Sequence, residues 1–299
     1  MATAQLKQEL RMPSDSLSEA YRLAYSTLEL LDCDYISEEK AHSRAYAEYK
    51  FFTADVRTEG PFGTDSEEVI SRPVNDDVFI QDTETFADKY DEFESLLHDF
   101  DVDEIAQPTR QLIRTVTYSL TISIGIAMDF LLDQQGARKN SGERFDDTII
   151  SIFEELAVVN SAEIKPFDQN QLDIIISPHG EVRSSEDSID PDEVVSIKTT
   201  SKDRFKNIYS DKSSLEATVG GEVDWIAIFL YDVQRQSRES MDYSIAKTFM
   251  PGRFEDFQSD DPLDGIYYID PPRGYRDTEY GAIVGDFDQF VCKDLWDLL

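Results

Sequence analysis

The chain has 299 residues, of which 62 are Asp or Glu and only 28 are Lys or Arg, so its formal net charge is −34. Apolar residues make up 40% of the sequence, enough to build a buried core, and this excludes a wholly disordered chain. The charge excludes a nucleic-acid-binding protein whose affinity comes from a broad basic surface.

Several features predict a protein of the cytoplasm. The two cysteines, Cys33 and Cys292, are too few for a disulfide framework or a cysteine-rich zinc site. The first twelve residues lack an apolar core, so we expect no signal peptide. The most apolar stretch, 115–128, is shorter than the roughly 20 residues of a membrane-spanning helix. We therefore expect a soluble protein that does not bind membranes.

The acidic residues are scattered along the whole chain and do not form a single acidic tail. This distribution favours a solvated, halophilic acidic surface, since molar salt reduces the Debye length to roughly 3 Å and weakens the repulsion. A DNA mimic or another partner-binding acidic protein is the alternative. If the habitat is salty, local charges decide whether DNA binds.

Residues 1–105 are expected to form an acidic, mostly helical N-terminal region. Apolar residues at helical spacing predict a helix over 17–31 and a second one over 38–52. The stretch 60–77, rich in Gly, Pro, Asp and Ser, is typical of a loop. Residues 96–104 are predicted to be a helix end followed by an acidic connection.

The character of the sequence changes after residue 105. Residues 116–126 alternate strictly between apolar and small polar residues, which predicts a strand, although the flanking residues have helical spacing. The remaining pattern predicts helices over 142–156, within 202–218 and over 287–298, and strands over 172–177, 193–200, 223–233 and 265–269. This order is typical of an α/β protein with a mixed sheet and helices packed on it.

Two charged residues stand in apolar strands. Asp173 directly precedes three isoleucines, and Lys198 lies between Ile197 and Thr199. A charge in a buried strand costs several kcal/mol unless it is paired or used. The two residues could satisfy each other as a structural ion pair. Alternatively, Asp173 binds a divalent metal and Lys198 assists an attacking water, the combination that phosphodiester hydrolysis needs.

Asp173 followed by Ser196-Ile197-Lys198 resembles the PD-(D/E)xK nuclease motif in its S-x-K form. The segment 198–204 (KTTSKDR) is similar to the K-x-x-x-R-(D/E)-R segment of type II restriction endonucleases that read CCGG or CCNGG sites. The segment 138–146 (RKNSGERFD) more loosely resembles a helix start in those enzymes. This resemblance implies a restriction-endonuclease-like core over 106–299, with a central mixed sheet flanked by helices.

The resemblance also implies an Mg²⁺ site. Asp173 would be the central metal ligand and Lys198 the catalytic lysine, with Ser196 where other members hold a second acid. Asp146 would be the carboxylate supplied by a helix. A further metal-binding carboxylate is expected after the lysine, and the candidates are Asp211 and Glu216.

Residues for DNA contact follow from the same resemblance: Lys202, Asp203 and Arg204 would read bases, and Arg138 and Lys139 would bind DNA nearby. An Asp can accept a hydrogen bond from cytosine N4, and an Arg can pair with guanine O6 and N7. Lys202 stands where the family usually has arginine, and lysine does not offer the same two-pronged contact.

The local charges favour DNA contact over a merely solvated surface. Residues 198–212 contain five bases against two acids, and residues 138–144 contain three bases against one acid. Both windows reverse the sign of a very acidic chain.

The sequence as a whole predicts a type II restriction endonuclease: a homodimer that cuts double-stranded DNA at a palindromic site containing CC and GG, with Mg²⁺ as cofactor. A repair-type or structure-specific nuclease with the same core is the first alternative. A non-catalytic acidic DNA mimic or partner-binding protein is the second.

Overall fold

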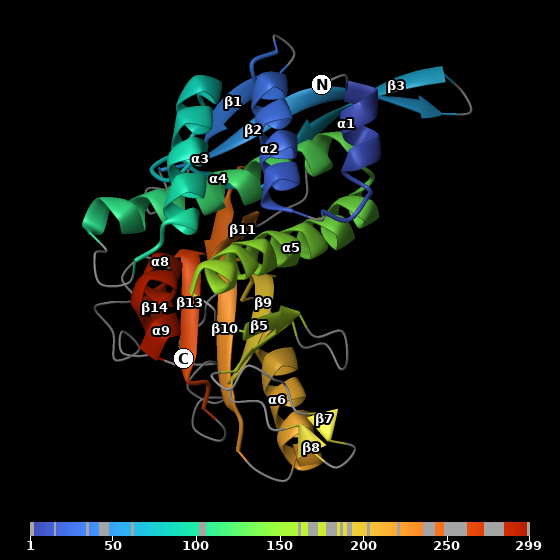
Figure 1. The fold of residues 1–299 in the computed structure, drawn as a ribbon. Coiled ribbons are helices and arrows are strands. Elements are labelled where there is room, and N and C mark those ends of the chain that lie inside the picture. The colour runs from blue at the N-terminus through green and yellow to red at the C-terminus, as the bar shows by residue number, and fades with distance from the viewer. Residues whose placement is uncertain are drawn as a thin grey trace. The chain divides into compact units, whose positions relative to one another are not determined.

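The fold is given by a computed structural model (Figure 1). It describes residues 3–14, 16–33, 36–41, 48–60, 63–101, 106–160, 163–166, 173–177, 184–185, 188–189, 193–201, 204–219, 222–235, 243–247, 262–271 and 284–297.

The chain forms two compact units whose segments alternate along the sequence. The first unit combines Met1–Asp91, Thr115–Thr148 and Val233–Ala246. The second combines Glu92–Arg114, Ile149–Asp232 and Lys247–Leu299. Each unit takes segments from both sides of residue 105, and the functional division at that residue stays a prediction.

The first unit contains an antiparallel sheet with the order β1-β2-β3, in which β4 also pairs with β2. Its strands are β1 (Ile36–Lys40), β2 (Tyr49–Gly60), β3 (Gly63–Ile70) and β4 (Val74–Asn75). The predicted helix over 38–52 is therefore wrong, and so is the loop over most of 60–77. Phe51, Phe52 and Thr53 are buried in β2, where aromatic and β-branched residues fit a sheet better than a helix.

The helices of the N-terminal region are α1 (Thr3–Glu9), α2 (Leu17–Leu31) and α3 (Thr83–His98). The helix predicted over 17–31 is confirmed as α2. It begins after Ser16, whose side chain accepts a hydrogen bond from the Glu19 N–H, and it buries the apolar side that its spacing predicts.

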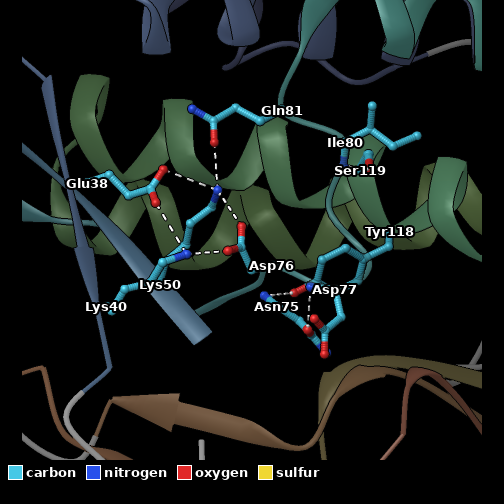
Figure 2. A network of polar contacts seen from close by, with 10 residues as sticks. All are labelled: Glu38, Lys40, Lys50, Asn75, Asp76, Asp77, Ile80, Gln81, Tyr118 and Ser119. Atoms are coloured by element: carbon cyan, nitrogen blue, oxygen red, sulfur yellow. Dashed lines mark hydrogen bonds and ion pairs between the residues drawn. The ribbon is translucent and has the colours of Figure 1, made fainter. Parts of the chain in front are cut away.

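A network of charged and polar side chains fixes the turn that follows β4 (Figure 2). The Lys50 ammonium is buried, 2.7 Å from Asp76 Oδ1, 2.6 Å from Gln81 Oε1 and 3.3 Å from Glu38 Oε2. Lys40 bonds the same two carboxylates, Glu38 and Asp76. Burial alone would raise the pKa of Asp76, but the hydrogen bonds from Lys40 and Lys50 outweigh it and the pKa is lowered.

Two long helices follow, α4 (Gln107–Leu131) and α5 (Gln134–Asn160). The strand predicted over 116–126 is wrong, because α4 covers it, whereas the helix predicted over 142–156 is confirmed within α5. The small polar residues that create the alternation are buried as well as the apolar ones: Thr117, Ser119, Thr121 and Ser123. None of the helices in the described ranges is long and apolar enough to span a bilayer.

The second unit contains a six-stranded mixed sheet with the order β14-β13-β10-β9-β6-β5. Its strands are β5 (Glu163–Pro166), β6 (Ile174–Ser177), β9 (Glu193–Thr200), β10 (Asp224–Tyr231), β13 (Gly265–Asp270) and β14 (Val284–Asp286). β9, β10, β13 and β14 are parallel, while β5 and β6 are antiparallel additions. The predicted mixed sheet and its four predicted strands are confirmed.

Helix α6 (Phe205–Val219) supplies Phe205, Ile208 and Leu215 to the core of this unit, together with Trp225 and Phe229 of the sheet. The predicted closing helix is confirmed as a helical stretch in three parts, α8 (Phe287–Gln289), the π-helical η5 (Phe290–Asp294) and α9 (Leu295–Asp297). Two short pairs complete the strands: β7 (Ser184–Ser185) with β8 (Ser188–Ile189), and β11 (Val233–Arg235) with β12 (Ile245–Lys247).

Candidate active site

The candidate active site lies where β6 begins beside β9. β6 runs antiparallel to β9, with Ile174 opposite Val195, so Asp173 reaches the part of β9 that carries Ser196 and Lys198. Both strands are rich in buried β-branched residues, which favour this pairing. Residues that are about 25 positions apart in the sequence thus become neighbours.

One oxygen of the Asp173 carboxylate, Oδ2, bonds two groups of β9 in this site. Lys198 Nζ lies 2.6 Å from Asp173 Oδ2, and the backbone N–H of Ile197 donates a hydrogen bond of 2.6 Å to the same oxygen. The Lys198 and Asp173 side chains are 22% and 16% exposed, so they are partly shielded and still reached by solvent. None of the described residues donates a hydrogen bond to the other oxygen, Oδ1.

Asp211 on α6 belongs to the same electrostatic environment. Burial raises the pKa of its carboxyl, the positive charge of Lys198 acts in the opposite direction, and the negative charge of Asp173 adds to the increase. The structure therefore brings Asp211 within electrostatic reach of both Asp173 and Lys198. Its role as a metal ligand stays a prediction.

Glu216, the other candidate carboxylate, has different partners. Its Oε1 accepts a hydrogen bond of 3.1 Å from the Val223 N–H and lies 3.6 Å from Lys212 Nζ. Glu216 comes five positions after Asp211, which is not a whole number of helical turns, so the two side chains point to different sides of α6. These contacts favour Asp211 as the ligand.

Ser196 is buried, with 1% of its surface exposed, and its Oγ accepts a hydrogen bond of 3.1 Å from Trp225 Nε1–H. Sequence reasoning missed Trp225, although the strand that contains it was predicted. The sequence could have pointed to this bond in only one way: a tryptophan in a predicted buried strand needs a hydrogen-bond acceptor for its indole N–H.

The two carboxylates suit a magnesium ion. Mg²⁺ prefers oxygen ligands, keeps several waters, and is usually held by one or two carboxylates together with substrate phosphates. Asp173 and Asp211 supply two such carboxylates. Within the described ranges no three His, Cys, Asp or Glu side chains form a metal-binding group.

The predicted contributors on α5 lie in the other compact unit. Asp146 is half-buried there, and its role as a helix-supplied metal ligand stays a prediction. The Arg138 side chain lies outside the described part of the structure. Lys139 is exposed, 3.6 Å from Glu143. Arg144, which contributes to the basic window, is buried and donates a hydrogen bond of 2.7 Å to the Glu9 carbonyl oxygen, so it is a structural residue.

Of the predicted base-reading residues, Lys202 and Asp203 lie outside the described ranges. Arg204 is exposed immediately before α6, and its carbonyl oxygen accepts a hydrogen bond from the Ile208 N–H in the first turn. Its side chain thus reaches solvent from a rigid helix start, only six residues after Lys198.

Comparisons with known proteins agree with this fold. No protein-family model and no curated protein matches the sequence. Among solved structures, the type IIP restriction endonuclease Kpn2I matches with a TM-score of 0.70 and 18% identity, over 98% of this chain and 97% of that one. The chain therefore has the fold of a restriction endonuclease, as the sequence predicted.

Two other matches are weaker. One is to the restriction endonuclease PspGI in complex with substrate DNA, with a TM-score of 0.39 and 13% identity, over 72% of this chain and 92% of that one. The other is to metal-depleted Ecl18kI in complex with uncleaved DNA, with a TM-score of 0.35 and 13% identity, over 72% and 64%.

Proposed function

We propose that the protein is an Mg²⁺-dependent type II restriction endonuclease that hydrolyses phosphodiester bonds of double-stranded DNA at a palindromic site containing CC and GG. The observation that carries the proposal is the Lys198–Asp173 contact of 2.6 Å between adjacent strands, with Asp211 within electrostatic reach. If Lys198 and Asp173 formed only a structural ion pair, the pair would not need Asp211, a second carboxylate that burial makes harder to ionise.

In this mechanism Asp173 and Asp211 would hold the metal, and Asp146 of α5 is the candidate for a further carboxylate ligand. When bound, Mg²⁺ stabilises the negative charge that develops on the phosphate. Asp173 holds Lys198 in place, and the ammonium orients the attacking water and adds positive charge beside the phosphate. The Ile197 N–H fixes the rotation of the Asp173 carboxylate.

Recognition is proposed to come from the start of α6. Arg204, together with Lys202 and Asp203, would contact base edges in the major groove, while Arg138 and Lys139 would bind DNA nearby. A homodimer in the cytoplasm would present two such sets related by two-fold symmetry, which matches a palindromic target.

The test is cleavage of unmethylated genomic DNA with Mg²⁺ or with EDTA, from low salt to molar KCl. Discrete bands that require Mg²⁺ are the expected result, and the sequences of the ends would give the site. A smear would instead support a repair-type nuclease. If the protein neither cut nor bound DNA, the acidic partner-binding alternative would replace the proposal.

Lys198→Ala makes this assay specific for the proposed site. We expect it to lower the cleavage rate by about 10²–10³-fold, because a positive charge next to the reacting phosphate is lost, while DNA binding persists. Lys7→Ala, on the exposed side of α1, is the control that removes a lysine from a distant surface. Equal cleavage by Lys198→Ala and Lys7→Ala would contradict the assignment of the lysine.

A further inference from the structure

Trp225 is the largest fully buried side chain described in the protein, and two hydrogen bonds to Asp264 hold its backbone. Its N–H donates a hydrogen bond of 2.7 Å to Asp264 Oδ2, and its carbonyl oxygen accepts one of 3.0 Å from the Asp264 N–H. Trp225 is therefore a well-anchored point near the start of β10.

The indole of Trp225 extends along the sheet toward the candidate active site. In the parallel pair β9–β10, Trp225 is opposite Val194, Ala227 is opposite Ser196, and Phe229 is opposite Lys198. The indole bonds Ser196, which lies two residues further along β9 than Val194, so the Trp225 side chain reaches diagonally from β10 to β9.

The hydrogen bond between Trp225 and Ser196 has only one direction. An indole N–H can only donate, so the Ser196 oxygen is the acceptor, and both groups are buried. Ser196 precedes Ile197, whose N–H bonds Asp173 Oδ2, and the same oxygen bonds Lys198 Nζ. An unbroken chain of short contacts thus connects the buried indole to the proposed catalytic pair.

We propose that Trp225 is a positioning residue, which holds Ile197 and Lys198 against Asp173 through its hydrogen bond to Ser196. Ser196 then acts as the link between the core and the active site, and not as a group that touches the metal or the DNA. The expected effect on cleavage rests on the proposed nuclease function, whereas the expected coupling of Trp225 to Asp173 and Lys198 does not.

The kinetic test uses the full-length protein with saturating Mg²⁺. Trp225→Phe keeps a ring but removes the donor, and Ser196→Ala removes the acceptor. Each should lower kcat by between about 10-fold and 100-fold and leave KM for DNA unchanged, because the reacting groups shift slightly while the DNA-binding surface does not. The double variant should be no slower than the slower single variant, since both break one interaction.

Ser196→Thr is the matched control, because it keeps the hydroxyl on a residue that suits a strand, and it should retain kcat. Wild-type kcat in Trp225→Phe, or losses that multiply in the double variant, would overturn the proposal. A rise in KM as large as the fall in kcat would also overturn it, since general loss of structure would then explain the effect.

A second measurement does not depend on cleavage. With ¹⁵N-labelled tryptophan, the protein should give two indole N–H signals, one from Trp225 and one from Trp296, which donates to the Val291 carbonyl oxygen at 2.8 Å. Asp173→Asn and Lys198→Met should each shift the Trp225 signal and leave the Trp296 signal in place. An unmoved Trp225 signal in both variants would refute the coupling. If the wild type cut no DNA, the proposed function would fail, but this spectrum would still decide the inference.

Discussion

Asp211 and Glu216 are carboxylates of one helix, α6, that have different surroundings. Asp211 is affected by both Lys198 and Asp173, and burial raises its pKa. Glu216 Oε1 accepts a hydrogen bond from the backbone N–H of Val223. A carboxylate that burial makes costly to ionise, and that also experiences the negative charge of a second carboxylate, is suited to a cation, whereas one that already accepts a hydrogen bond from a backbone N–H is less so.

Asp211→Asn should therefore raise the Mg²⁺ concentration for half-maximal cleavage by at least about 10-fold. Because the pKa of Asp211 is raised, its carboxyl is protonated at a higher pH than an ordinary aspartate, and the metal needs the carboxylate. The Mg²⁺ requirement of the wild type should therefore increase as the pH falls. Glu216→Gln should leave the Mg²⁺ titration unchanged and lower the free energy of unfolding by about 1 kcal/mol. A shifted Mg²⁺ titration in Glu216→Gln alone would reverse the assignment.

The site residues could be predicted only as far as each stands out locally. Asp173 and Lys198 are charges in apolar strands, and that contrast is visible in the sequence. The bond from Trp225 to Ser196 joins residues 29 positions apart and depends on the register of β9 against β10. No local pattern encodes that register, so the link became visible only in the folded chain.

At the scale of the element, α4 explains why strict alternation predicted the wrong structure. Two of its buried polar side chains bond a neighbouring segment: Ser119 Oγ accepts the Ile80 N–H, and the Tyr118 hydroxyl accepts the Asn75 N–H (Figure 2). Thr121 Oγ1 donates to the Thr117 carbonyl oxygen within the helix. A helix buried on all sides has no polar face, so its sequence lacks the period of 3.6 that identifies surface helices.

Gly125 on α4 makes room for an arginine. Arg72 Nε and Nη2 each lie 2.9 Å from an oxygen of Asp129, and Nη1 lies 2.6 Å from Ser141 Oγ. A Cβ atom at residue 125 would overlap the Arg72 guanidinium. Because these three bonds hold the guanidinium, it cannot move aside without losing them.

Gly125→Ala should therefore lower the free energy of unfolding by about 2–3 kcal/mol, as measured by urea denaturation, since charged hydrogen bonds are broken. Gly142→Ala is the matched control within α5, because a Cβ there meets nothing within 4 Å. That variant should gain about 0.5–1 kcal/mol from the better helix propensity of alanine. Equal effects of the two substitutions would show that the Arg72 contacts do not require the glycine.

At the scale of the whole molecule, the fold is built from segments that the sequence order separates. Four strands of the second unit's sheet, β6, β9, β10 and β13, were predictable, because each is a short apolar run bounded by polar residues, whereas β5 and β14 were not predicted. The sheet of the first unit was not predictable, because the residues that form β1 and β2 have a local pattern that also suits a helix. The assignment of segments to two interleaved units follows from such long-range pairing, which no local window contains.

The charge of −34 also acts at this scale, because scattered like charges destabilise the compact state through mutual repulsion. A pair with one buried partner, such as Lys50 with Asp76, is screened less by salt than acids that are fully exposed. The melting temperature should therefore rise by at least about 5 °C between 0.1 M and 2 M KCl, as followed by circular dichroism.

A charge-reduced variant identifies the cause of this rise. Glu84, Asp88 and Glu94 are exposed on α3, and replacing them with Gln, Asn and Gln removes three negative charges without touching the core. The variant should melt at a higher temperature than the wild type at 0.1 M KCl, because less repulsion remains to be screened. The difference should shrink as salt is added and vanish near 2 M. Parallel melting curves at all salt concentrations would show instead that KCl stabilises the protein by some route other than screening its acidic surface.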